Sequence, residues 1–224
     1  MIETFPTSAA AADAAAFAIG RRLAEALQTR GRASLVATGG RSPGPVFDRL
    51  RLQPGIDWSR VVATLSDERC VPPDDPASNA KGVRERLLVG EAAKAHFLPL
   101  WPAPDPAALR ALTPFDAVML GMGEDGHIAS LIPGDPDLAA AMDPAAEALT
   151  VSVPAGLGSP PVARISLTFA ALSQARAIFL LIAGETKREV IARAEAGADL
   201  PVRALITQAQ APVRVLWSPA HEGN

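Results

Sequence analysis

Residues 33–51 read ASLVATGGRSPGPVFDRLR, and this stretch decides the fold. Its first part, Ala33–Thr38, is an apolar run that is too short for a helix and has the length of a buried parallel strand. The glycine-rich segment Gly39–Gly44 follows. Within it Ser42 and Pro43 favour a helix start, as a hydroxyl cap followed by a proline at the first helical position. The stretch therefore predicts one strand, loop and helix unit of an α/β protein.

The same pattern recurs along the chain. Apolar runs bounded by turn residues predict further buried strands at Val61–Ser66, Phe115–Gly121 and Ala177–Ala183. Weaker strand candidates are Phe97–Leu100, Leu149–Val153, Ala163–Thr168 and Val213–Trp217. Helical spacing predicts helices at Ser8–Arg30 (closed by Gly31), Pro43–Arg51, Ser78–Leu88, Asp105–Leu112, Glu185–Ala196 and Pro201–Gln208. This alternation predicts a mostly parallel sheet with helices on both faces.

Composition narrows the class of protein. With 224 residues, 49% of them hydrophobic, the chain can bury one substantial core, and we expect a single domain over residues 1–224. The net charge of −3 provides no basic field that would attract nucleic acid or an anionic membrane. An anionic ligand would therefore need a local cationic pocket. No sequence feature indicates an obligate protein partner.

The sequence also favours a cytoplasmic protein. Its first residues carry no basic region before the apolar stretch, and no stretch reaches the roughly 18 apolar residues of a membrane helix. The single cysteine, Cys70, cannot form an internal disulfide, which suits a reducing compartment.

Candidate site residues gather in the loops after the four strong strands, because ligands of open α/β sheets bind at the carboxyl ends of the strands. These loops read GGRSPG, DERCVPPDD, GMGEDGH and GETK. In the first, Gly39, Gly40, Arg41 and Ser42 form a candidate phosphate cradle at a helix start, although a simple capped turn would look the same. An ATP-binding loop is excluded, because 45–46 are Pro-Val where Lys and a hydroxyl residue are required.

The third loop contains Gly121-x-Gly123-x-x-Gly126, which has the spacing of a dinucleotide fingerprint. That fingerprint normally opens the first strand and helix unit, whereas this one lies late in the chain, so we expect no dinucleotide cofactor. The loop instead brings Asp125 and His127, two residues apart, to the edge of the sheet. This pair can perform general-base chemistry.

Charged residues follow or begin other predicted strands. Asp67, Glu68 and Arg69 come directly after a strand, where they either bind a polyhydroxy ligand or pair and cap locally. Lys187 stands at a helix start and Arg164 at a strand start, where each can hold a phosphate.

Metal and thiol chemistry receive less support. The three histidines, His96, His127 and His221, share no short ligand spacing, so we expect no zinc site. We expect His96 and His221 to have no catalytic role. Cys70 could act as a nucleophile, but a small buried thiol is the commoner outcome.

Taken together, these motifs resemble the 6-phosphogluconolactonase family, in order and over most of the chain. The resemblance rests on Ser66–Pro72 with Ser78-Asn79, on Leu120–Leu131, on Arg164–Thr168 and on the Lys187 loop. It implies the Rossmann-like fold shared with glucosamine-6-phosphate deaminase and ribose-5-phosphate isomerase. The implied reaction is hydrolysis of 6-phospho-D-glucono-1,5-lactone to 6-phospho-D-gluconate in the oxidative pentose phosphate pathway, without metal or cofactor.

The resemblance also suggests roles for the candidate residues. His127 would be the base that activates water, oriented by either Asp125 or Asp67. The phosphate would bind to the N–H groups of Gly39–Ser42, to Arg164 and to Lys187. Arg69 or the glycine-loop N–H groups would stabilise the oxyanion.

Two alternatives stay open at this point. The deaminase branch has a glutamate five positions after the histidine, where this chain has Ile132, which cannot relay a proton. A sugar-phosphate sensor would usually carry a DNA-binding segment, and no basic helix-turn-helix precedes the first predicted strand. Departures from the lactonase pattern are Arg41, Ala80 and Ile132, which affect details of the pocket.

Overall fold

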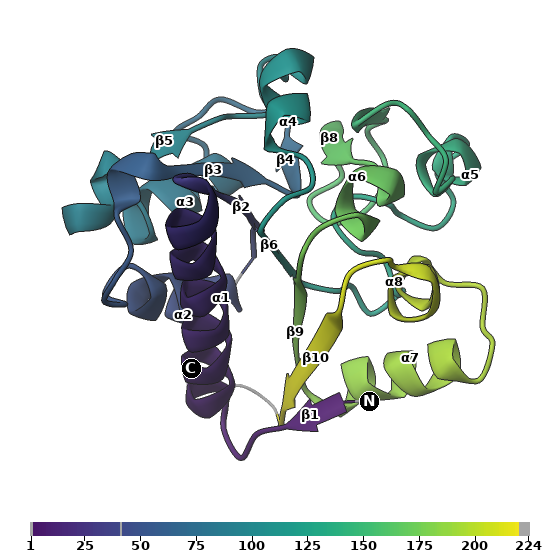
Figure 1. The fold of residues 1–224 in the computed structure, drawn as a ribbon. Coiled ribbons are helices and arrows are strands. Elements are labelled where there is room, and N and C mark those ends of the chain that lie inside the picture. The colour runs from purple at the N-terminus through teal and green to yellow at the C-terminus, as the bar shows by residue number, and fades with distance from the viewer. Residues whose placement is uncertain (1, 41, 220–224) are drawn as a thin grey trace.

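The computed structural model describes residues 2–40 and 42–219, and its main feature is a seven-stranded sheet in which every neighbouring pair is parallel (Figure 1). In spatial order its strands are β1 (Ile2–Thr4), β10 (Val213–Ser218), β9 (Ile178–Ala183), β6 (Ala117–Leu120), β2 (Ala33–Ala37), β3 (Val61–Leu65) and β5 (His96–Phe97). Every residue of β2 and β6 is buried, as the continuous apolar runs predicted.

Helices cover both faces of this sheet. Along the chain the helices are α1 (Ser8–Arg30), α2 (Pro43–Leu50), α3 (Asn79–Arg86), α4 (Pro106–Leu112), α5 (Leu138–Ala141), α6 (Phe169–Ser173), α7 (Glu185–Glu195) and α8 (Pro201–Gln208). The long α1 packs across β2, β6, β9 and β10 and against α2, whereas α7 packs on β9 and against α8. Figure 1 shows α1 and α2 to the left of β9 and β10, and α7 and α8 to their right. The predicted α/β fold is confirmed.

A second sheet corrects one part of the prediction. The segment Asp67–Arg69, predicted as a loop, is strand β4, and it pairs antiparallel with β8 (Arg164–Leu167), which pairs antiparallel with β7 (Thr150–Val153). Two weak strand candidates therefore lie outside the parallel sheet. The reason is tertiary: Leu167 N–H donates to the carbonyl of Ser66 (2.8 Å), so the chain leaving β3 continues into pairing with β8.

Several short elements lack the sequence signals on which the prediction relied. Strand β1 has only three residues, α5 and α6 have four and five, and two 3₁₀ turns lie at Trp58–Arg60 and Gly90–Lys94. Strand β5 is His96–Phe97 rather than Phe97–Leu100. Ser42 occupies the N-cap position of α2, but its backbone is already helical and its side chain makes no capping hydrogen bond, contrary to the prediction.

The core lies between the parallel sheet and its helices. Its largest fully buried side chains include Phe115, Phe169 and Phe179. The helix α1 contributes a face of alanines together with Ile19 and Leu23, which lets it approach the strands closely. In the part of the chain that the structure describes, no helix has both the length and the apolar character needed to cross a bilayer.

Candidate active site

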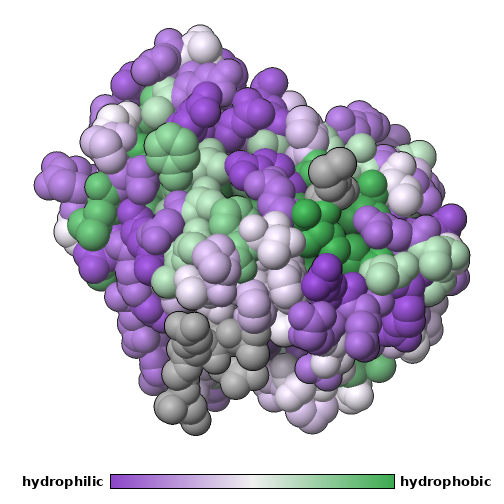
Figure 2. Space-filling model, turned by 90° about the horizontal axis from the view of Figure 1, so that it is seen from below, coloured by the Kyte–Doolittle hydropathy of each residue, from purple (hydrophilic) through white to green (hydrophobic). Residues whose placement is uncertain are grey.

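A pocket of about 170 Å³ lies at the carboxyl ends of the parallel strands. Figure 2 views the molecule from the side to which the arrow of β10 points in Figure 1, and hydrophilic residues cover much of this face. Eight predicted site residues line the pocket: Gly39, Gly40, Ser42, Asp67, Arg69, His127, Arg164 and Lys187. Arg41 lies outside the described residues. The structure thus brings together residues from five separate segments: the glycine loop, β4, the loop after β6, β8 and the first turn of α7.

His127 is held by Asp125. The two side chains meet through His127 Nδ1 and Asp125 Oδ1, which are 2.6 Å apart, and the same Oδ1 accepts the backbone N–H of His127 at 3.2 Å. This hydrogen bond from His127 lowers the pKa of the Asp125 carboxyl, and it outweighs the opposing effect of partial burial. Because a carboxylate accepts at Nδ1, the proton of the neutral imidazole belongs on Nδ1 and its lone pair on Nε2.

The loop after β6 brings this pair together. Gly123 N–H donates to the carbonyl of His127 (3.0 Å), and Gly126 N–H donates to the carbonyl of Gly123 (3.1 Å). A side chain at Gly123 would overlap both the His127 ring and the Asp125 carboxylate, so this position requires glycine. Gly126 has a φ of +81°, and its carbonyl accepts from Val202 N–H at the start of α8 (3.0 Å).

Asp67 has different partners. Its carboxylate accepts hydrogen bonds from Ser66 Oγ (2.8 Å) and Ser130 Oγ (2.7 Å), and Ser130 Oγ in turn accepts from Arg164 Nη1 (3.3 Å). Of the two carboxylates proposed to orient His127, the structure therefore places Asp125, and not Asp67, against the imidazole. Asp67 lines the pocket, but its carboxylate belongs to a buried hydrogen-bond network with Ser66, Ser130 and Arg164. Ser130, which bridges Asp67 to Arg164, had no signal in the sequence beyond its place in the segment Leu120–Leu131.

Arg69 and Arg164 form the cationic wall of the pocket. They are register partners across the antiparallel strands β4 and β8. In each, the Nε atom is buried and makes no hydrogen bond within the described residues. Burial and the charge of Arg69 lower the pKa of Arg164. Two neighbouring guanidinium groups with unused donors repel each other, and an anion between them would remove that cost.

The glycine loop lies against α3. A side chain at Gly39 would overlap the Asn79 amide, one at Gly44 would overlap the Arg86 guanidinium, and Gly40 has a φ of +100°. Asn79 donates from Nδ2 to the carbonyl of Asp67 (2.9 Å) and lines the pocket. The glycines are therefore needed for close packing and backbone geometry, whatever the loop binds.

The other candidates among the described residues, Cys70 and His96, do not line this pocket. Burial and the nearby charge of Glu68 raise the pKa of the Cys70 thiol, which opposes its activation as a nucleophile. His96 is exposed on β5, and His221 lies outside the described residues. Among residues 2–40 and 42–219, no three His, Cys, Asp or Glu side chains cluster in a way that could hold a metal ion.

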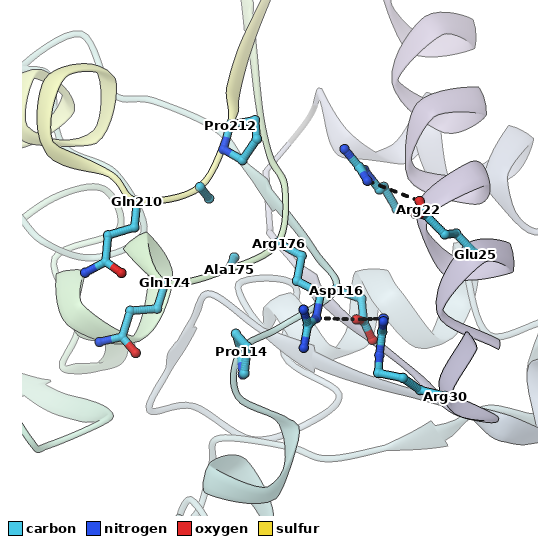
Figure 3. Close-up of a pocket in the computed structure, with 11 residues that line it drawn as sticks. Arg22, Glu25, Arg30, Pro114, Asp116, Gln174, Ala175, Arg176, Gln210 and Pro212 are labelled. Atoms are coloured by element: carbon cyan, nitrogen blue, oxygen red, sulfur yellow. Dashed lines mark hydrogen bonds and ion pairs between the residues drawn. The ribbon is translucent and has the colours of Figure 1, made fainter. Parts of the chain in front are cut away.

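A second pocket, of about 450 Å³, lies at the amino ends of the same strands (Figure 3). Asp116 directly precedes β6, and its buried carboxylate pairs with Arg30 and with Arg176, whose Nε is 3.3 Å away. Arg22 pairs with Glu25 at 3.1 Å. These arginines already have carboxylate partners within the pocket, and none of the predicted site residues that the structure describes lies there. The pocket at the carboxyl ends is thus the candidate active site.

The fold and this site define an α/β protein in which a histidine paired with a carboxylate lies beside a cationic pocket. A family model described as glucosamine-6-phosphate isomerases/6-phosphogluconolactonase matches residues 6–217, and the chain belongs to this family. It is 40% identical to a 6-phosphogluconolactonase of Caulobacter vibrioides, over 97% of each chain. The crystal structure of a 6-phosphogluconolactonase from Shewanella baltica superposes with a TM-score of 0.87, at 38% identity, covering 97% of both chains.

The fold is also shared with the deaminase branch. A monomeric glucosamine-6-phosphate deaminase superposes with a TM-score of 0.77 at 19% identity, covering 97% of this chain and 96% of that one. At this identity the likeness concerns the fold alone, so the two branches have to be separated by their site residues.

Proposed function

We propose that this protein hydrolyses 6-phospho-D-glucono-1,5-lactone to 6-phospho-D-gluconate, the lactonase step of the oxidative pentose phosphate pathway. The observation that carries the proposal is the pairing of His127 with Asp125 at a pocket whose wall presents Arg69 and Arg164. A base and an anion site in one pocket suit a phosphorylated substrate attacked by water. The relatives named above as 6-phosphogluconolactonases support the same activity.

The phosphate would bind at the cationic wall. Arg164 and Arg69 provide guanidinium donors, and Lys187 lies in the first turn of α7, where the helix dipole also favours an anion. Gly39 and Gly40 line the same pocket, and their N–H groups would add neutral donors. Anchoring the phosphate fixes the distance from His127 to the lactone carbonyl. Phosphate binding would therefore also orient the lactone for attack.

The reaction then follows from the state of His127. Its Nε2 takes a proton from water as the water oxygen attacks the lactone carbonyl carbon, and a tetrahedral oxyanion forms. Asp125 stabilises the imidazolium through Nδ1–H. When the oxyanion collapses, the bond from the carbonyl carbon to the ring oxygen breaks, and the imidazolium returns its proton to that oxygen. Arg69 or the glycine-loop N–H groups would hold the oxyanion.

The deaminase alternative is disfavoured by Ile132. This side chain is 3% exposed and packs in the interior, at the position where that branch has a glutamate that assists ring opening. An isoleucine side chain has no ionisable group and cannot transfer a proton. The sensor alternative keeps binding but lacks turnover, so an activity assay separates it from the lactonase.

The first test compares wild type with His127→Ala on freshly made 6-phosphoglucono-δ-lactone, in EDTA and with spontaneous hydrolysis subtracted. A general base contributes about 100- to 10,000-fold, so we expect kcat to fall at least about 100-fold. The matched control is His96→Ala, because His96 is an exposed histidine outside the pocket. We expect this control to keep wild-type activity.

Two outcomes would overturn the proposal. If wild type binds 6-phosphogluconate but does not accelerate hydrolysis, the protein is a sensor. If wild type is fast and His127→Ala is equally fast, another group is the base.

Phosphate binding has its own test. Lys187→Ala should raise KM for the phosphorylated lactone at least about 10-fold, because a charge-assisted contact is lost. It should leave the slow hydrolysis of unphosphorylated glucono-δ-lactone unchanged. An equal effect on both substrates would show that Lys187 does not bind the phosphate.

A further inference from the structure

Glu68 is a buried carboxylate inside the site motif that the proposed reaction does not use. The residue is only 2% exposed. Its Oε1 accepts the backbone N–H groups of Arg69 and Asn79, each at 2.7 Å. Its Oε2 accepts the N–H of Ala80 at 2.7 Å and the hydroxyl of Ser78 at 3.1 Å. Four hydrogen bonds to one buried carboxylate hold the donor groups in fixed positions relative to Glu68.

Three of these donors belong to the beginning of α3. Ser78 is the N-cap of this helix, and its Oγ accepts from Lys81 N–H at 3.2 Å. In a capping box the residue at Lys81 would be glutamate or glutamine, and the first turn of α3 contains no acidic residue. Glu68 therefore supplies from β4 the carboxylate that α3 lacks, and it meets the positive end of the helix dipole.

This attachment determines the place of two pocket residues. Asn79 is the first residue of α3, lines the pocket, and lies so close to Gly39 that no side chain fits there. Ala77 directly precedes the N-cap, and its carbonyl accepts Arg69 Nη1 at 2.6 Å. The start of α3 thus holds both the Asn79 amide and the Arg69 guanidinium at the pocket wall.

We propose that Glu68 is a positioning residue for the lactonase site: it fixes the start of α3 to β4 and thereby sets the positions of Asn79 and Arg69. This inference rests on the proposed function for its assay. Glu68 touches neither His127 nor Asp125, so it acts on substrate placement and not on proton transfer.

The test is Glu68→Gln compared with Val83→Ala. The Gln amide has the shape of the carboxylate, but its NH₂ group is a hydrogen-bond donor and cannot accept. It would face backbone N–H groups that are also donors, so we expect the start of α3 to shift away from position 68. Val83→Ala is the matched control, because Val83 is fully buried on the same helix and makes none of these contacts. Both substitutions should lower the melting temperature. Comparing the kcat/KM of the two variants therefore separates an effect on the site from a general loss of α3 stability.

We expect kcat/KM of Glu68→Gln to fall by about 30-fold or more, chiefly through KM, since a displacement of about 1 Å at a site can cost about 100-fold. The pH at half-maximal kcat should not move. Val83→Ala should stay within about threefold of wild type. Equal losses in the two variants at similar melting temperatures would reduce Glu68 to a structural residue and overturn the inference.

Two further measurements keep the test decisive. If Glu68→Gln does not fold, Ser78→Ala removes only one of the four donors, and an unchanged KM in that variant would overturn the inference. Calorimetric binding of 6-phosphogluconate is measured for every variant. If wild type does not hydrolyse the lactone, the proposed function fails, whereas weaker binding by Glu68→Gln than by Val83→Ala would still support positioning.

Discussion

Asp125→Asn tests the pairing on which the proposed mechanism depends. The substitution keeps the size of the side chain but removes the charge that faces the imidazolium across a 2.6 Å contact. Two unit charges about 4 Å apart interact by about 1 kcal/mol in water and about 4 kcal/mol near a protein surface. The Asp125 side chain is 46% exposed and that of His127 is 24% exposed, so the pair lies between these two environments. We therefore estimate that Asp125 stabilises the imidazolium by about 2 kcal/mol. This corresponds to about a 30-fold loss in kcat.

The assay is steady-state hydrolysis of fresh 6-phosphoglucono-δ-lactone, with kcat and KM determined separately. KM should change little, because the imidazolium forms only on the way to the transition state. Glu124→Gln is the control: it neutralises the preceding carboxylate, which is exposed and is not the partner of His127. A kcat for Asp125→Asn within threefold of wild type, or an equal loss in Glu124→Gln, would refute the reasoning.

Two further predictions concern the loop and the N-terminal edge of the sheet. Gly123→Ala should lower kcat/KM by about 100-fold because the added methyl displaces His127. Gly82→Ala, where nothing lies within 4 Å and which does not line the pocket, should be nearly silent in the same assay. The paired hydrogen bonds from Arg214 lower the pKa of Glu3, so the pair stabilises the fold above about pH 4.5 and that stability is lost as the pH falls further. Glu3→Gln should therefore lower the melting temperature by at most about 2–4 °C at pH 7, since both side chains are partly exposed, and melting curves should show the difference from wild type shrinking toward pH 3; a constant difference would contradict this.

Much of the fold could be predicted because its central strands are buried on both faces. The strands β2, β3, β6 and β9 form from nearly continuous apolar runs. Such a run can be recognised in the sequence without knowing which strands pair with it. Strand β4 could not be predicted in this way. Its residues Asp67–Arg69 are charged, and they form a strand only because β8 provides the hydrogen-bonding edge.

The loop positions of the candidate site were also predictable, because parallel strands bring their carboxyl ends to one edge. That rule placed Gly39, Lys187 and His127 around one pocket although they come from different parts of the chain. It did not assign partners within the pocket, since the rule concerns backbone direction and not side-chain contacts.

The sequence placed Asp125 and His127 in the same short loop, because two residues separated by one glycine stay close whatever the fold around them. The choice of Asp125 as the partner of His127, and the roles of Asp67 and Glu68, depend on contacts between distant segments of the chain. Asp67 is engaged by Ser130, 63 residues away, and Glu68 by the start of α3. Those choices depend on burial and on donors from distant segments, and such donors come within reach only when the strands and helices have packed.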